Sequence, residues 1–149
     1  RLKNIHQDFK NFEAKEKFDL IVSNPPYFEV SGSDKDKVAR QTIELNFKQL
    51  ISKSSVLLLQ SGIFSVIIPS ETGPDFIELA KENQLFLIKK INIKGIDNSK
   101  VKRLILEFSL TENGLEESEF VIEKSPRKYS DQYLELTKEF HIFKKEAGN

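Results

Sequence analysis

The feature that most constrains the fold is a short apolar run that stops at two prolines. Residues 18 to 30 read FDLIVSNPPYFEV, so Phe18–Ser23 runs directly into Asn24, Pro25 and Pro26. Each proline lacks the backbone N–H that a sheet ladder needs, so the strand must end at Ser23 or Asn24. A continuous apolar run is typical of a strand buried in a parallel sheet. The sequence therefore predicts an α/β fold with a stiff segment at the carboxyl end of one strand, where such sheets place their ligands.

The rest of the chain alternates between expected strands and helices. A mobile polar loop is expected at residues 31–40 and turn chemistry at residues 95–99. Helices are expected at residues 43–59 and 71–83, and a closing helix through residue 140 has Ser130 as its N-cap. Further strands are expected at residues 2–7, 62–69, 85–94, 101–111 and 120–123. This order predicts one domain, residues 1–149, with a mostly parallel sheet that has an antiparallel strand at its end.

The composition limits the kind of partner. The 149 residues include 23 Lys and Arg against 23 Asp and Glu, so any nucleic-acid site must come from local clusters of charge. The chain has no cysteine, and His6 and His141 are far apart, so we expect no metal site. No apolar run approaches about 18 residues and no signal peptide is evident, which predicts a cytoplasmic protein with no membrane segment. Because the chain has no methionine, we expect it to be a processed or truncated piece.

Several segments together resemble a known family. Asn-Pro-Pro-Tyr after a buried strand is the signature of Rossmann-like, S-adenosylmethionine-dependent methyltransferases that methylate amino groups. Within that group the chain is similar to the bacterial adenine-N6-methyltransferases that modify valine tRNA beside its anticodon. The segments that carry this similarity are NPPYF, the Ala39-Arg40 pair, FSVIIP at 64–69, IKG with SKVKRLILEFS at 93–109, and YSDQYLELTKEF at 129–140. The resemblance covers essentially the whole chain and implies a class I methyltransferase fold, S-adenosylmethionine as cofactor and tRNA as substrate.

The chain departs from that family at its amino end. The family opens with a Gly-rich turn after its first strand and an acidic residue that ends its second, but this sequence contains no G-x-G. The match begins near the third strand, so we expect a partial domain that is inactive alone. An unpaired apolar sheet edge would then favour a homo-oligomer. The resemblance assigns Asp8 to the adenine amine of the cofactor and Phe9 to its ring, although a surface turn is the alternative for Asp8.

The chemistry of amine methylation accounts for the motif without the resemblance. An aromatic amine spreads its lone pair into the ring, and acceptors on its two N–H groups hold the nitrogen nearer to tetrahedral geometry. The side-chain oxygen of Asn24 and the carbonyl of Pro25 can supply these acceptors, and Pro26 restricts the backbone. Tyr27 and Phe28 offer rings for stacking a flipped base. We therefore predict catalytic roles for Asn24, Pro25, Pro26 and Tyr27, substrate contacts for Tyr27 and Phe28, and a cofactor contact for Asn24. A turn that only ends the strand is the alternative.

Basic residues that could bind RNA gather in two places. The stretch 89–103 holds five Lys and one Arg against the single acid Asp97, a local excess that suits phosphate groups. Arg40 follows the polar loop that is expected to act as a lid. We predict substrate contacts for Arg40, Lys100, Lys102 and Arg103, with a solvated surface as the alternative.

Two rival functions remain open from the sequence. Protein glutamine methyltransferases of the release-factor type share the NPPY motif because an amide nitrogen is also planar. The second rival is a non-catalytic fragment that lacks the glycine loop for the cofactor and acts only as an interaction module.

Overall fold

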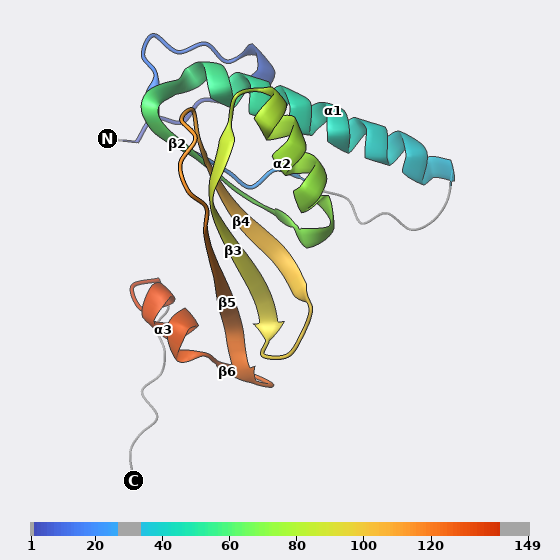
Figure 1. The fold of residues 1–149 in the computed structure, drawn as a ribbon, viewed down its shortest axis with the longest axis vertical. Coiled ribbons are helices and arrows are strands. Elements are labelled where there is room, and N and C mark those ends of the chain that lie inside the picture. Colours follow the sequence, from blue (N-terminus) through green and yellow to red (C-terminus); the bar gives the residue numbers. More distant parts are fainter. Residues whose placement is uncertain (1, 27–33, 141–149) are drawn as a thin grey trace.

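A computed structural model describes residues 2–26 and 34–140 of the chain, which form a mixed sheet with helices (Figure 1). The strands are β1 (Phe18–Ser23), β2 (Leu58–Pro69), β3 (Phe86–Ile96), β4 (Val101–Ser109), β5 (Glu116–Ser125) and β6 (Lys128–Tyr129). The helices are α1 (Asp34–Leu57), α2 (Gly73–Glu82) and α3 (Asp131–Thr137), with short 3-10 turns η1 (Phe9–Asn11) and η2 (Ser70–Thr72).

Four strands run in one direction. Among the described residues the sheet order is β1-β2-β4-β3-β5-β6, with β1 parallel to β2 and β3 parallel to β5. Because β4 is antiparallel to both β2 and β3, the strands β1, β2, β3 and β5 share one carboxyl edge. The predicted mostly parallel sheet with an antiparallel strand is confirmed.

The expected position of β4, the antiparallel strand of the predicted hairpin, is wrong. It lies between β2 and β3 instead of at the end of the sheet. The turn between β3 and β4 is too short for a crossover, so β4 must pair with β3 as a hairpin. The α2 crossover places β3 one position away from β2, and β4 fills the gap.

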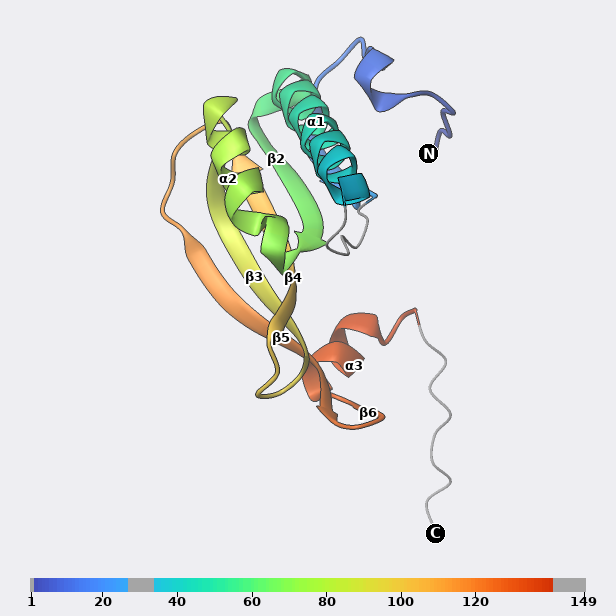
Figure 2. The same ribbon diagram turned by 90° about the vertical axis from the view of Figure 1, so that its right-hand side faces the viewer.

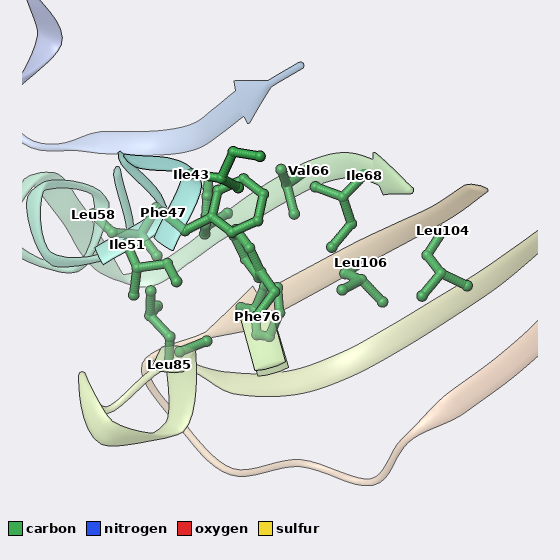
Figure 3. Close-up of a cluster of buried hydrophobic side chains, with 13 residues drawn as sticks. Ile43, Phe47, Ile51, Leu58, Val66, Ile68, Phe76, Leu85, Leu104 and Leu106 are labelled. Atoms are coloured by element: carbon green, nitrogen blue, oxygen red, sulfur yellow. The ribbon is translucent and has the colours of Figure 1, made fainter. Parts of the chain in front are cut away.

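The core lies between the sheet and the pair α1 and α2 (Figure 3). Alternate residues of β2 are buried against these helices because side chains along a strand alternate between faces. Phe47 of α1 meets Phe76 of α2 edge to face, with ring centroids 5.0 Å apart, and Phe64 stacks on Phe108 at 6.0 Å. The buried cluster is Ile43, Phe47, Ile51, Leu58, Phe64, Val66, Ile68, Phe76, Ala80, Leu85, Leu104, Leu106 and Phe108.

The face of β1 that points away from these helices is exposed. Leu20 and Val22 are 57% and 70% exposed, and the outer edge of β1 has no pairing partner within residues 2–26 and 34–140. This is the apolar open edge that the sequence predicts for a partial domain.

Several elements differ from the sequence predictions in their extent or in whether they form. Residues 34–40, expected to belong to a loop, form the start of α1, since polarity alone does not distinguish a loop from the solvent-facing turns of a helix. The helix ends at Leu57, and residues 58–61, which include part of the expected helix, belong to β2. Residues 2–7 form no strand, because no neighbouring strand within the described part of the chain is there to pair with them.

The carboxyl-terminal third contains a longer strand than the sequence predicts. β5 begins at Glu116 instead of residue 120, because its acidic first half pairs with the lysines of β3. The predicted N-cap is confirmed, since the Ser130 hydroxyl accepts a hydrogen bond of 3.0 Å from the backbone N–H of Tyr133.

Candidate functional site

Asn24 leaves the sheet at its carboxyl edge. β1 ends at Ser23, as the two prolines require, and Ser23 pairs with Val66 of β2. Pro25 is buried whereas Asn24 and Pro26 are exposed, so the backbone is anchored and the amide faces solvent. Within residues 2–26 and 34–140 no hydrogen bond joins the exposed Asn24 side chain to another residue. The predicted stacking residues Tyr27 and Phe28 lie outside the described residues.

A hollow of about 1530 Å³ opens at the same edge. Its walls are the first half of α1, the end of β2 with η2, the start of α2 and the start of β4. The structure brings all four predicted cationic substrate contacts into its lining, namely Arg40, Lys100, Lys102 and Arg103. Four acids line it as well: Glu44, Glu71, Asp75 and Glu78. The cations come from α1, from β4 and from Lys100 directly before it, and most of the acids come from η2 and α2. The hollow therefore offers donors for phosphate and acceptors for amino or hydroxyl groups.

Hydrogen bonds from two residues of η2 fix part of the wall of this hollow. The Ser70 hydroxyl donates to the Val101 carbonyl at 2.8 Å, and the Thr72 hydroxyl donates to the Pro69 carbonyl at 2.9 Å. Sequence reasoning missed Ser70 and Thr72. They directly follow the end of the clearest strand, so the rule that singled out Asn24 could have found them.

Part of the basic stretch 89–103 is occupied by ion pairs with β5. Lys89 lies 3.9 Å from Glu116, Lys90 lies 3.1 Å from Glu117, and Lys94 lies 2.7 Å from Glu119. A hydrogen bond from the Asn92 amide, followed by the contact with Lys90, lowers the pKa of Glu117 below its ordinary value. These three lysines join two strands, whereas Lys100, Lys102 and Arg103 line the hollow.

The predicted cofactor contacts Asp8 and Phe9 lie at the other end of β1. Phe9 stacks on Phe12 and Phe12 on Phe18, the first residue of β1, each pair with ring centroids 6.3 Å apart. Asp8 caps η1 and pairs with Lys10 at 3.2 Å, and the backbone N–H of Lys10 lowers its pKa. The structure therefore brings Asp8 near Phe9 but not near Asn24, and the described residues do not by themselves fit a complete S-adenosylmethionine site.

Two features are absent from the part of the chain that the structure describes. No group of three or more His, Asp or Glu side chains within residues 2–26 and 34–140 is arranged to hold a metal ion. No helix in that part of the chain is both long and apolar enough to cross a membrane.

Comparison with known proteins gives consistent results. Residues 1–104 match the family described as Eco57I restriction-modification methylase. A protein of Flavobacteriaceae bacterium (strain 3519-10), named tRNA1(Val) (adenine(37)-N6)-methyltransferase, is 51% identical over 144 residues, which are 96% of this chain and 62% of that protein. A protein of the same name from Flavobacterium johnsoniae is 36% identical over 95% of this chain and 63% of its own length. The chain thus spans less than two thirds of these relatives.

A solved structure shares the fold. A protein of Agrobacterium tumefaciens described as a predicted O-methyltransferase superposes with a TM-score of 0.60 at 15% identity, covering 83% of this chain and 56% of that one. The sheet and the strand-end motif thus agree with the family match, which covers more than half of the sequence. The methyltransferase membership expected from the NPPY motif is confirmed, and the chain belongs to the Eco57I restriction-modification methylase family.

Proposed function

We propose that the whole protein is an S-adenosylmethionine-dependent methyltransferase that modifies the exocyclic amine of an adenine in tRNA. The observation that carries this proposal is the exposed Asn24, held at the carboxyl end of β1 by the buried Pro25. The relatives named as tRNA adenine methyltransferases support the substrate class. A tRNA substrate also implies a cytoplasmic location.

Asn24 and Pro25 orient the amine. The Asn24 side-chain oxygen and the Pro25 carbonyl accept hydrogen bonds from its two N–H groups, so the nitrogen lone pair is directed away from the acceptors. Pro26 keeps the backbone in one conformation, and Tyr27 and Phe28 are the proposed stacking partners of the base. The cofactor supplies the methyl group, and Asp8 and Phe9 remain its proposed contacts in the whole protein.

Arg40, Lys100, Lys102 and Arg103 are the proposed contacts for the RNA backbone. They line one hollow at the sheet edge where Asn24 leaves β1, although Asn24 itself is not in the lining. The proposal places the target nucleotide at the amide and the neighbouring phosphates near the cations. Lys89, Lys90 and Lys94 are not part of this surface, because their charges are paired with β5.

Alone, the 149-residue chain is expected to be inactive. The sequence has no G-x-G, and Asp8 and Asn24 lie at opposite ends of β1, so calorimetric titration of this chain should give no micromolar binding of S-adenosylmethionine. The exposed Leu20 and Val22 favour association of the isolated chain into a homo-oligomer through β1.

The test of substrate class is a competition between substrates. The whole protein is supplied with labelled S-adenosylmethionine and either unmodified tRNA or a peptide-chain release factor. Label should enter tRNA, at N6 of an adenine. Preferential labelling of a release-factor glutamine would replace this proposal with the glutamine alternative, and no labelling of either would favour the non-catalytic one.

A further inference from the structure

The β5–β6 hairpin projects beyond the strand ends on the side of the sheet where Asn24 lies. Pairing joins Pro69 of β2 to Arg103, Arg103 to Ile93, and Ile93 to Phe120 of β5. β2 stops at this level, but β5 continues to Ser125, roughly 16 Å farther along the strand. Figure 2 shows this extension, with β6 and α3 at its lower end.

The turn of this hairpin holds an arginine in a conformation that suits glycine. Ser125 pairs with Lys128, so Pro126 and Arg127 make the turn. Arg127 has a φ of 65°, in the left-handed region. Proline followed by a left-handed residue is the pattern of a type II turn, whose left-handed position normally takes glycine or asparagine. A non-glycine residue in this conformation is grounds for a functional hypothesis, and the side chain that occupies it here is a cation.

The base of the hairpin is fixed by hydrogen bonds. The backbone N–H of Ser130 donates to the Ile122 carbonyl at 2.8 Å, and the Ser130 hydroxyl donates to the Val121 carbonyl at 2.5 Å. Tyr129 stacks on Tyr133 of α3 with ring centroids 4.5 Å apart. A turn held in this way loses little conformational freedom when a ligand binds.

The acids near the turn are already engaged. A Glu123 carboxylate oxygen accepts the backbone N–H of Arg127 at 3.2 Å, and Asp131 lies 3.5 Å from Lys124. The exposed side chains of Arg127 and Lys128 form no ion pair with any other residue that the structure describes. Two cations therefore remain at the tip of the hairpin.

We propose that Arg127 and Lys128 form a second contact for the phosphate backbone of the RNA substrate, beyond the hollow. This inference rests on the proposed function. β6 is separated from β4, which carries Lys102, by β3 and β5, so the two cationic sites are displaced by about 14 Å across the strands, at about 4.8 Å for each of three spacings. The hairpin tip also lies roughly 16 Å farther along the strands, which makes the separation about 20 Å. Several nucleotides can span this distance, whereas a single nucleotide at Asn24 cannot.

The test compares RNA binding with stability in the whole protein. The Arg127→Gly variant removes the cation and relieves the strain, so its melting temperature should stay the same or rise while its Kd for unmodified tRNA rises at least threefold. The Lys128→Ala variant should weaken binding similarly. In the double variant the slope of log affinity against log salt should fall by about 0.7 to 0.9 for each lost contact.

Gln84 provides the matched control. It has a φ of 60° between α2 and β3, at the opposite edge of the sheet. The Gln84→Gly variant should relieve the same strain and leave the Kd and the salt slope for tRNA unchanged.

An unchanged Kd and salt slope in the Arg127→Gly, Lys128→Ala double variant would overturn this inference alone, provided that the wild-type protein methylates tRNA. A wild-type protein that neither binds nor methylates tRNA would overturn both this inference and the proposed function.

Discussion

The Ser70 hydroxyl donates a 2.8 Å hydrogen bond to the carbonyl of Val101. This bond joins the end of β2 to the start of β4 at the edge where Asn24 leaves β1. Lys100 and Lys102 flank Val101 and line the hollow. Ser70 therefore acts as a positioning residue for the basic wall.

The Ser70→Ala variant should place the cations of β4 less accurately. We expect a severalfold higher KM for tRNA with little change in kcat, and a loss of stability of about 1 kcal/mol from the missing hydrogen bond. The Ser70→Thr variant keeps a hydroxyl and should recover the KM. The matched control is Ser109→Ala, which removes a bond from the Ser109 hydroxyl to the Thr111 carbonyl at the far end of β4. If both alanine variants raised the KM equally, Ser70 would have no positioning role.

Replacing Ser54 should stabilise the protein. This serine of α1 is fully buried, and its hydroxyl has no hydrogen-bond partner among the described residues. A buried hydroxyl without a partner is unfavourable, and alanine is the better helix former, so Ser54→Ala should raise the free energy of unfolding by about 1 kcal/mol.

Urea unfolding of the whole protein measures this change. The control is Ser55→Ala, because the neighbouring Ser55 hydroxyl donates to the Ser52 carbonyl at 2.8 Å, and it should give a smaller gain or a loss. Destabilisation by Ser54→Ala would mean that the hydroxyl has a bonding partner.

Gly62 should not tolerate a side chain. A Cβ at this position would lie 2.8 Å from the Phe18 carbonyl oxygen, at the irregular start of the β1 and β2 pairing. Because backbone is harder to displace than a side-chain end, Gly62→Ala should lower the free energy of unfolding by about 1 to 3 kcal/mol. Thermal denaturation should compare this variant with Gly114→Ala, because nothing lies within 4 Å of a Cβ at Gly114. Equal melting temperatures for the two variants would contradict the close approach.

The sequence was sufficient to predict the features that depend on local chemistry. The two prolines set the end of β1 at Ser23, and the hydroxyl of Ser130 set the start of α3. The start of α1 could not be predicted in this way, because charged residues suit an exposed helix face as well as a loop. The sheet position of β4 follows from a crossover and a hairpin together, and no single segment specifies it.

The site shows the same division. Asn24 and Pro25 could be proposed from the sequence because their place after a strand is a local property. That Arg40 lines the same hollow as Lys100 and Lys102 depends on how α1 crosses the sheet, which the residue pattern does not specify. The predicted substrate contacts included Lys102 and not Lys89 or Lys94, and the ion pairs of Lys89 and Lys94 with β5 give the structural difference between them.

The most direct test of the central claim is methyl transfer to unmodified tRNA by the Asn24→Ala variant of the whole protein. Because the proposed role of the amide is to bind the target amine, this variant should lose methyl transfer while its affinity for S-adenosylmethionine stays within about tenfold of the wild type, or ~1.4 kcal/mol. The control is Asn46→Ala, which removes an exposed amide from α1 and should leave turnover unchanged. Near-normal turnover by Asn24→Ala would contradict the assignment of this site.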